Sequence, residues 1–211
     1  MAIAIILRKR HNINKFRDMM IDVIRSGCGD SALLCSGFFQ ERKIFYGNVS
    51  PYQVSQEANL ANVLAQNNIQ LTTVGIHSRE WIQSYRNFRD NLIAAHVNID
   101  AKYNKNLRWH AKVFIISSNG TSIFGIIGSS NMTRSAFSVS KPFNYECDVI
   151  LWSDKVPGLI QRVNELLARD FEVDELIKAP YLEEENGNLS VEVRLDMIKA
   201  EIFKAELIEL D

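Results

Sequence analysis

The sequence predicts an α/β fold, because strands and amphipathic helices alternate along its first hundred residues. Strands are expected at residues 2–7, 31–39 and 69–76, since each is a short apolar run bounded by polar or turn residues. Helices are expected at residues 14–27 and 55–67, where apolar residues recur with helical spacing. Alternation of this kind favours a layered fold whose sheet contains some parallel pairs of strands.

Each predicted helix has an apolar stripe and a capping residue. Ser55 and Ser78 fit N-caps, and Gly27 fits the residue that ends the first helix. The residues expected to be buried are Phe16, Met19, Met20, Val23 and Ile24 in the first helix, Leu60, Val63 and Leu64 in the second, and Trp81, Tyr85, Phe88 and Leu92 in the third.

The second half of the chain predicts a β-hairpin, a further strand at 144–152 and a helix at 156–171. After Pro180 the sequence is acidic and only weakly helical in pattern. It fits a docked C-terminal element, a dimer contact or a linker. We therefore expect a main domain over residues 1–178 and a partly helical, acidic extension over residues 179–211.

Composition describes an ordinary soluble globular protein. The chain has 211 residues, of which 46% are hydrophobic and 23% charged, and its formal net charge is −1. A nucleic-acid partner would therefore need a local rather than a global positive potential. Basic residues gather near the hairpin, namely Lys102, Lys105, Arg108, Lys112, Arg134 and Lys141.

Cysteine usage and the N-terminal pattern suggest a cytoplasmic protein. Three cysteines (Cys28, Cys35 and Cys147) match no zinc spacing and give no disulfide framework, which suits a reducing compartment. The apolar run near residue 5 is short and precedes the basic residues, the reverse of a secretory signal. We expect no membrane partner and no cofactor.

The Asn-Gly pair at 119–120 lies between two apolar runs and predicts a hairpin with a two-residue turn. In that register Lys112 faces Ile127 and His110 faces Ser129. Residues two apart in a strand project to the same face, so the imidazole and the ammonium are expected on one side. A slip of one residue would turn Ser129 away from the histidine.

The segment 129–137 predicts a helix start with Ser130 or Asn131 as its N-cap. Free backbone N–H groups at such a start favour an anion, so with His110 and Lys112 the collection fits a phosphate diester. No second histidine or carboxylate cluster lies nearby in the sequence, and we expect no metal site. The residues expected to contact the substrate are Ser129, Ser130, Arg134 and Arg108.

These residues resemble a known motif. His-x-Lys at 110–112 followed by Gly-Ser-x-Asn at 128–131 is similar to H-x-K-x4-D-x6-G-S-x-N of the phospholipase D superfamily, and "NYECDVIL" at 144–151 is similar to its acidic strand. The resemblance covers about residues 105–152. It implies a mixed β-sheet flanked by helices on both faces. The catalytic residues that it implies are His110, Lys112, Asn131 and Glu146.

One departure from the motif concerns its aspartate. That residue falls at Ser117, and the spacing from there to Gly128 is longer than the motif expects. In this superfamily the aspartate is mainly structural, so its loss bears on stability or subfamily more than on chemistry. Single-motif members without it include the nuclease domains of some metal-independent restriction endonucleases.

The resemblance implies a two-step, metal-independent hydrolysis of a phosphodiester. Neutral His110 attacks phosphorus to form a phosphohistidine, a second histidine protonates the leaving oxygen, and water releases the product. Lys112 and Asn131 stabilise the non-bridging oxygens, and Glu146 orients an imidazole. Because the motif occurs once in the chain, we expect a homodimer that places two copies of His110 across one phosphate.

Three functions follow as alternatives. The leading one is a metal-independent endonuclease acting on DNA, with RNA as the second candidate substrate, and restriction-type enzymes are one form of it. The second is a phosphodiesterase for phospholipids or other small molecules. The third is a catalytically silent nucleic-acid-binding module, in which the missing aspartate reflects decay.

Overall fold

A computed structural model gives the arrangement of the chain. It describes residues 2–42, 44–45, 48–49, 51–76, 81–105, 110–169 and 175–211. The predicted N-cap Ser78 lies outside these ranges. No helix among the described residues is long and apolar enough to cross a bilayer.

Nine strands of the described chain form one mixed sheet, in the order β10-β1-β9-β8-β7-β2-β5-β6-β11. Strands β2, β5 and β6 run parallel to one another, and the remaining neighbours pair antiparallel. Their bounds are β1 Ala2–Arg8, β2 Ser31–Ser36, β5 Gln70–Ile76, β6 Ile99–Asn104, β7 Lys112–Ser118, β8 Thr121–Gly128, β9 Glu146–Trp152, β10 Leu176–Pro180 and β11 Ile208–Glu209.

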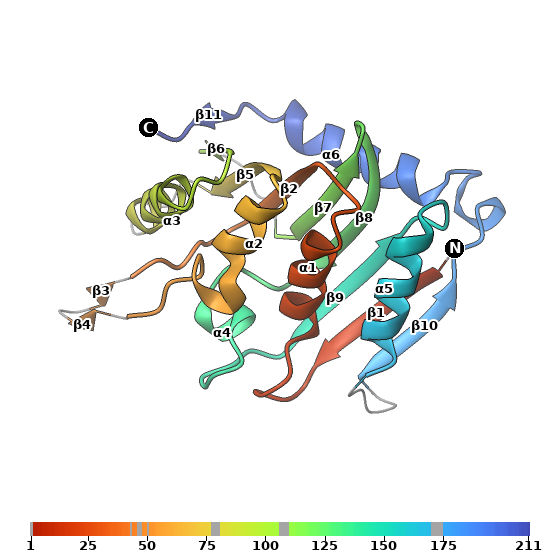
Figure 1. The fold of residues 1–211 in the computed structure, drawn as a ribbon, viewed down its shortest axis with the longest axis horizontal. Coiled ribbons are helices and arrows are strands. Elements are labelled where there is room, and N and C mark those ends of the chain that lie inside the picture. The colour runs from red at the N-terminus through yellow and green to blue at the C-terminus, as the bar shows by residue number, and fades with distance from the viewer. Residues whose placement is uncertain are drawn as a thin grey trace.

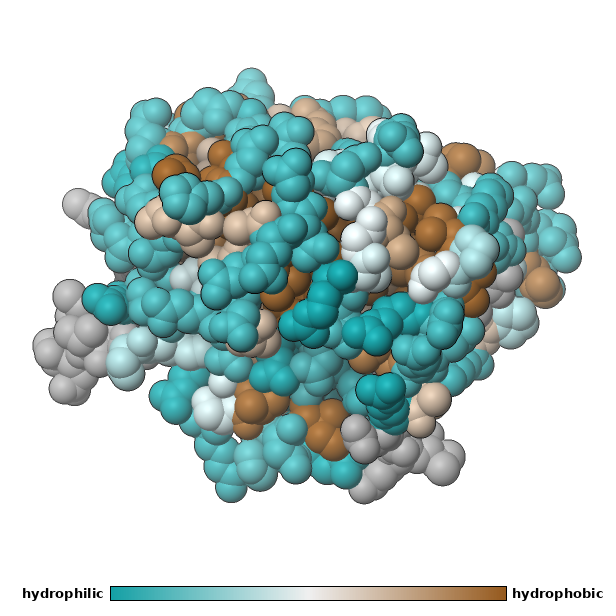
Figure 2. Space-filling model, viewed as in Figure 1, coloured by the Kyte–Doolittle hydropathy of each residue, from teal (hydrophilic) through white to brown (hydrophobic). Residues whose placement is uncertain are grey.

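Helices cover both faces of this sheet, which confirms the predicted fold class (Figure 1). One face packs against α1, α2, α3 and α5, and the other against α6. Figure 2 views the first face, where hydrophilic side chains dominate and apolar ones show between them. The helices are α1 Lys15–Arg25, α2 Leu60–Gln66, α3 Ile82–Ala94, α4 Arg134–Phe137, α5 Pro157–Leu167 and α6 Val191–Lys204.

The predicted apolar stripes are buried, except that Trp81 is half-buried and precedes α3 as its N-cap residue. Helix α1 ends as predicted, since Gly27 adopts a positive φ of 66° directly after the C-cap residue. Ser55 was expected to cap α2, but a 3-10 turn at Glu57–Asn59 precedes that helix. The Ser55 hydroxyl instead donates to the buried carboxylate of Glu41.

Three strands of the sheet had no sequence signal strong enough to predict them. β6 reads "IDAKYN" and is held between β5 and β11, while β10 and β11 pair at the two edges of the sheet. Outside the main sheet, the short strand β3 (Ile44–Phe45) pairs with β4 (Asn48–Val49).

The hairpin turn at Asn119–Gly120 is confirmed, with positive φ at both residues, but the predicted register is wrong beyond it. Ser118 pairs with Thr121 as expected, and an irregularity between Ile116 and Ser117 then shifts the ladder by one residue. Lys112 therefore faces Gly128 instead of Ile127. Continuing this ladder aligns position 110 with position 130, not with Ser129.

Helix α6 lies close to the sheet because Gly125 of β8 has no side chain. A Cβ atom there would stand 2.4 Å from Leu195 Cδ2, which forces the two apart. Leu195 is completely buried among side chains of β2, β7 and β9. Leu195 is thus one of the buried apolar side chains, together with Val191 and Ile202, through which α6 packs on the sheet.

We predict that Leu195→Ala lowers the free energy of unfolding by about 2–5 kcal/mol, because it removes a buried side chain that Gly125 cannot replace. Urea denaturation measures this loss. Val193→Ala is the matched control, since Val193 is on the same helix and 45% exposed, and it is expected to change the same quantity by less than about 0.5 kcal/mol. Equal losses in the two variants would contradict the assignment of Leu195 as the docking contact.

Candidate active site

The candidate site lies at one end of the sheet, where β1, β2 and β8 finish and β7 and β9 begin. We call this end, with Arg8, Ser36, Lys112, Gly128 and Glu146 as the terminal strand residues, the polar edge. Because antiparallel neighbours alternate in direction, this edge collects residues from distant parts of the chain. Both halves of the predicted motif meet there.

Lys112 is the first residue of β7, and His110 precedes the strand rather than lying within it. Lys112 Nζ donates to the backbone oxygen of His110 at 2.6 Å, so the ammonium sits beside the histidine. The residue His110 is exposed, and within the described chain its imidazole makes no hydrogen bond. The ring is therefore open to a ligand or a partner.

Glu146 begins β9 and is 8% exposed. The Ser129 hydroxyl donates to Glu146 Oε2, and Cys147 N donates to Ser129 Oγ at 3.0 Å. These contacts tie the end of β8 to the start of β9. Ser129 was predicted to face His110, and it instead donates a hydrogen bond to Glu146. In the part of the chain described, Glu146 makes no hydrogen bond to the His110 ring.

Asn131 is held from the neighbouring strand β2. Ser36 Oγ lies 3.3 Å from Asn131 Oδ1, and it accepts a hydrogen bond from Met132 N at 3.1 Å. A hydroxyl that contacts the amide oxygen of Asn131 leaves the amide NH2 as the group available to donate to an anion. Ser36 was not identified from the sequence, because the contact spans nearly a hundred residues.

The predicted helix start at Ser130 or Asn131 is wrong. Helix α4 begins at Arg134 after the N-cap residue Thr133, and it is only one turn long. Three backbone N–H groups of this segment have partners, since Ser130 N donates to Asp148 Oδ1, Met132 N donates to Ser36 Oγ and Arg134 N donates to Gln40 Oε1. The phosphate-binding helix N-terminus expected at Ser130 or Asn131 is therefore not formed.

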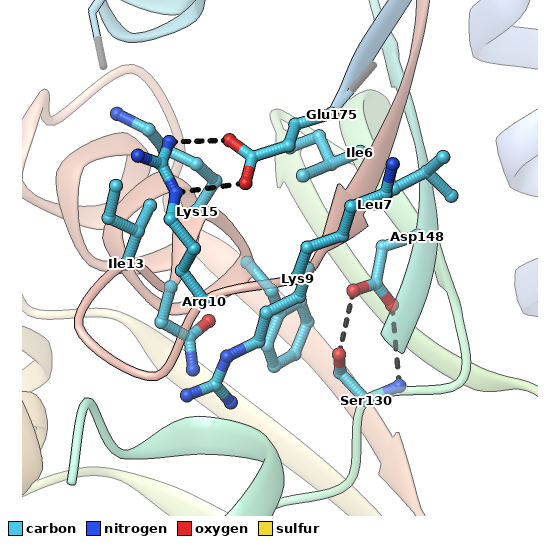
Figure 3. A pocket seen from close by; sticks show the side chains of 12 residues that line it. Ile6, Leu7, Lys9, Arg10, Ile13, Lys15, Ser130, Asp148 and Glu175 are labelled. Atoms are coloured by element: carbon cyan, nitrogen blue, oxygen red, sulfur yellow. Dashed lines mark hydrogen bonds and ion pairs between the residues drawn. The ribbon is translucent and has the colours of Figure 1, made fainter. Parts of the chain in front are cut away.

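Asp148 is a buried carboxylate that the sequence reasoning missed. It is 3% exposed and accepts two hydrogen bonds from Ser130, one from N at 3.3 Å and one from Oγ at 2.6 Å (Figure 3). Burial and the neighbouring charge of Glu146 raise the pKa of Asp148 to about 6, although the bonds from Ser130 oppose this. Strand periodicity could have found it, because Glu146 and Asp148 are two apart in one strand.

Arg8 is a second residue that the sequence reasoning missed. It ends β1 opposite Glu146, and its guanidinium donates to the backbone oxygens of Ser135 and Ala136 at 2.9 Å and of Ser138 at 2.6 Å. Burial lowers the pKa of Arg8, and the charge of Glu146 acts in the opposite direction. This side chain fixes the turn of α4 beside the polar edge.

The predicted basic cluster is only partly available. Lys102 is engaged in ion pairs with Glu209 and with Asp100. Lys105 and Lys141 are exposed, and Arg134 is half-buried with its Nε donating to Ser140 at 3.2 Å. Arg108 lies outside the described residues.

Ser117, which stands where the motif has aspartate, is at the far end of β7 from Lys112. It is buried, lies 3.4 Å from Ser122 Oγ, and accepts a hydrogen bond from Lys199 Nζ of α6 at 3.2 Å. The departure from the motif therefore affects the contact with α6 rather than the polar edge.

The polar edge combines an open imidazole, an ammonium, an amide and a carboxylate. An imidazole can act as nucleophile or proton carrier, and the ammonium and amide can stabilise a phosphoryl oxygen. Among the residues that the structure describes, no three histidine, cysteine or acidic side chains lie together as a metal would require.

Comparison with known proteins agrees with the motif. The family model described as "Cardiolipin synthase, PLD-like domain" matches residues 27–173, which is more than half of the chain. The match contains β2 through α5 and hence the larger part of the polar edge. No curated protein matches the sequence.

Several solved structures resemble the fold at low identity. Nuc from Salmonella typhimurium, a phospholipase D family member, is 13% identical, with 86% of this chain and 100% of that chain covered and a TM-score of 0.46. NucT from Helicobacter pylori is 12% identical, with 83% and 98% covered and a TM-score of 0.38. Phosphatidylserine synthase from Haemophilus influenzae Rd KW20 is 9% identical, with 98% and 46% covered and a TM-score of 0.47.

We predict that Asp148 makes the protein less stable as pH rises from about 4 to about 6. The folded chain holds this proton with a pKa of about 6, whereas an unfolded aspartate releases it near pH ~3.9, so the folded state binds more protons in that window. The shift corresponds to roughly 3 kcal/mol. Urea unfolding at a series of pH values should show the free energy of wild type falling relative to that of Asp148→Asn, and parallel curves would contradict the buried carboxylate.

Proposed function

The chain belongs to the phospholipase D-like family, and from this premise we propose that it is a metal-independent phosphodiesterase that cuts DNA as an endonuclease. The observation that carries the proposal is the meeting of the two motif halves, His110 with Lys112 and Ser129 with Asn131, at one edge of the sheet. A phosphodiester needs a nucleophile on one side and donors for its non-bridging oxygens. The side chains at this edge supply both kinds of group.

In the first step the neutral imidazole of His110 attacks phosphorus, a P–N bond forms, and the P–O bond to the leaving group breaks. The leaving oxygen takes a proton from a second imidazole. In the second step water attacks the phosphohistidine, gives its proton to that same imidazole, and the P–N bond breaks. No metal-bound hydroxide is required at either step.

Each supporting residue has a distinct part in this scheme. Lys112 and the amide of Asn131 stabilise the charge that develops on the non-bridging oxygens. Glu146 Oε2 accepts a hydrogen bond from the Ser129 hydroxyl. Glu146 Oε1 is then left to accept a hydrogen bond from an imidazole N–H, which fixes the tautomer of that imidazole. Ser130 and Arg134 support the loop, and Arg108 is proposed to contact the substrate.

The exposed cationic and aromatic side chains around the site suit a nucleic acid as the substrate. Lys105 directly follows β6, and Lys141 lies in the segment between α4 and β9. Both are exposed cations, and such charges favour a substrate with many phosphates. Tyr145, directly before Glu146, is 76% exposed and offers an aromatic face on which a base can stack. We therefore favour nucleic acid over a phospholipid as the substrate, with DNA as the first candidate and RNA as the second.

The mechanism needs two imidazoles, and the motif supplies one per chain. We propose a homodimer in which a twofold axis places two copies of His110 across one phosphate. Two close, identical imidazoles resist carrying two charges and share one proton, which provides a nucleophile and an acid together.

We predict that the purified protein cleaves DNA in the presence of EDTA and that His110→Ala abolishes cleavage. The expected loss follows from removing the nucleophile. His96→Asn is the matched control, since His96 is exposed away from the polar edge and asparagine tolerates its positive φ of 63°. Duplex and single-stranded DNA, RNA and a phosphatidyl headgroup-release assay are compared side by side.

Three outcomes would contradict this function. Cleavage that requires Mg²⁺ argues against the metal-independent mechanism, and headgroup release without nuclease activity favours the phospholipid alternative. Failure to trap a phosphohistidine on any of these substrates favours a silent binding module.

A mixing experiment tests the composite dimer. When equal amounts of wild type and His110→Ala are unfolded and refolded together, activity per total protein should fall to about one quarter of that of wild type, since only dimers of two wild-type chains, about one quarter of the random pairs, retain both imidazoles. A monomeric enzyme would keep about one half. Sedimentation equilibrium of the same samples should give a dimer mass, and a monomer mass in an active sample would overturn the proposal.

A further inference from the structure

We propose that Asp148 is a positioning residue of the candidate site, which fixes the loop from Gly128 to Asn131 so that the Asn131 amide is directed at the bound phosphodiester. This inference rests on the proposed function, because it assigns Asp148 an effect on the same reaction. Asp148 acts through the loop and touches no substrate itself.

The contact between Asp148 and Ser130 holds both main chain and side chain of the loop. Two carboxylate oxygens accept from two donors on one residue, N and Oγ of Ser130, so both the position and the rotation of that residue are fixed. Ser130 is buried, and the next residue is Asn131. A shift of Ser130 therefore moves the Asn131 amide directly.

The strand pairing around this contact is built for it. Gly128 pairs with Asp148 across β8 and β9, and a Cβ atom at position 128 would lie 2.0 Å from Asp148 Oδ1 and 2.5 Å from Cys147 O. Only a glycine leaves room for the carboxylate to reach Ser130 at this point. The Gly-Ser pair of the motif thus accommodates the aspartate that follows it by about twenty residues.

Stability does not account for this carboxylate. Burial raises its pKa to about 6, which means that the folded protein destabilises the charged form relative to an aspartate in water. The charges around it are mixed, with Glu146 on its own strand, Arg8 on β1, and Lys9, Arg10 and Lys15 with Glu175 lining the small cavity beside it (Figure 3). Because this carboxylate does not stabilise the fold, we assign it a local role, and its contacts with Ser130 indicate that this role is to position the loop.

A double-mutant cycle separates positioning from simple destabilisation. Asp148→Asn keeps the size and one acceptor but loses the second acceptor for Ser130. In the wild-type background it should lower kcat for DNA cleavage roughly 10- to 100-fold with little change in KM. In the Asn131→Ala background the same change should cost less than about twofold, because the amide that Asp148 directs is already absent.

Asp196→Asn is the matched control. Asp196 of α6 makes a similar carboxylate–serine contact, because its Oδ1 accepts a hydrogen bond from Ser122 N at 3.1 Å. Ser122 lies at the end of β8 opposite to Gly128. This variant should leave kcat unchanged in both backgrounds. Equal losses of kcat from Asp148→Asn in the two backgrounds, or a loss of similar size from Asp196→Asn, would overturn the proposal.

Hydrogen exchange of the Ser130 and Met132 amides keeps the inference testable even if the protein cuts none of the substrates. Asp148→Asn should speed exchange at these two amides and leave the Ser122 amide unchanged, and Asp196→Asn should do the reverse. Absence of cleavage by wild type would refute the proposed function. Unchanged exchange at Ser130 in Asp148→Asn would refute the positioning role by itself.

Discussion

The close approach of β8 and β9 at Gly128 and Asp148 is the contact on which the candidate site depends. Because Gly128 has no side chain, the Asp148 carboxylate reaches Ser130 across the strand pair. Two residues earlier on β9, the carboxylate of Glu146 accepts a hydrogen bond from the Ser129 hydroxyl. Glu146 and Asp148, two apart in β9, thus bind the consecutive loop residues Ser129 and Ser130. Asn131 directly follows these two bound residues.

Much of the fold is predictable because it rests on local patterns. The apolar stripe of α1, the strand at β5 and the Asn119–Gly120 turn each carry a signal within a few residues. β6 lacks such a signal, since its sequence alternates polar and apolar residues only weakly, and its place depends on β5 and β11 on either side. The pairing of such a strand is a property of the whole sheet.

The site was predictable in its residue types but not in its geometry. The motif located His110 and Asn131, whereas the irregularity between Ile116 and Ser117 shifted the register by one residue. That shift involves the buried Ser117, the hydroxyl of Ser122 beside it, and Lys199 from the distant helix α6, so no local pattern could have revealed it. The helix expected to start at Ser130 does not form there for a related reason. The backbone N–H groups of Ser130 and Met132 donate to side chains from distant strands, Asp148 and Ser36 respectively.

The position of Ser117 explains how the chain can depart from the family motif without disturbing the polar edge. A carboxylate still serves the hairpin turn, since Asp30 Oδ2 accepts a hydrogen bond from Asn119 N at 2.6 Å, and this bond lowers the pKa of Asp30. Lys199 of α6 meanwhile donates to the Ser117 hydroxyl. The far end of the hairpin is therefore held by Asp30, which directly precedes β2, and by Lys199 of α6, whereas the polar edge, a full strand length away, is held by β9. Because the two ends have separate supports, a change at Ser117 leaves the contacts that hold the polar edge in place.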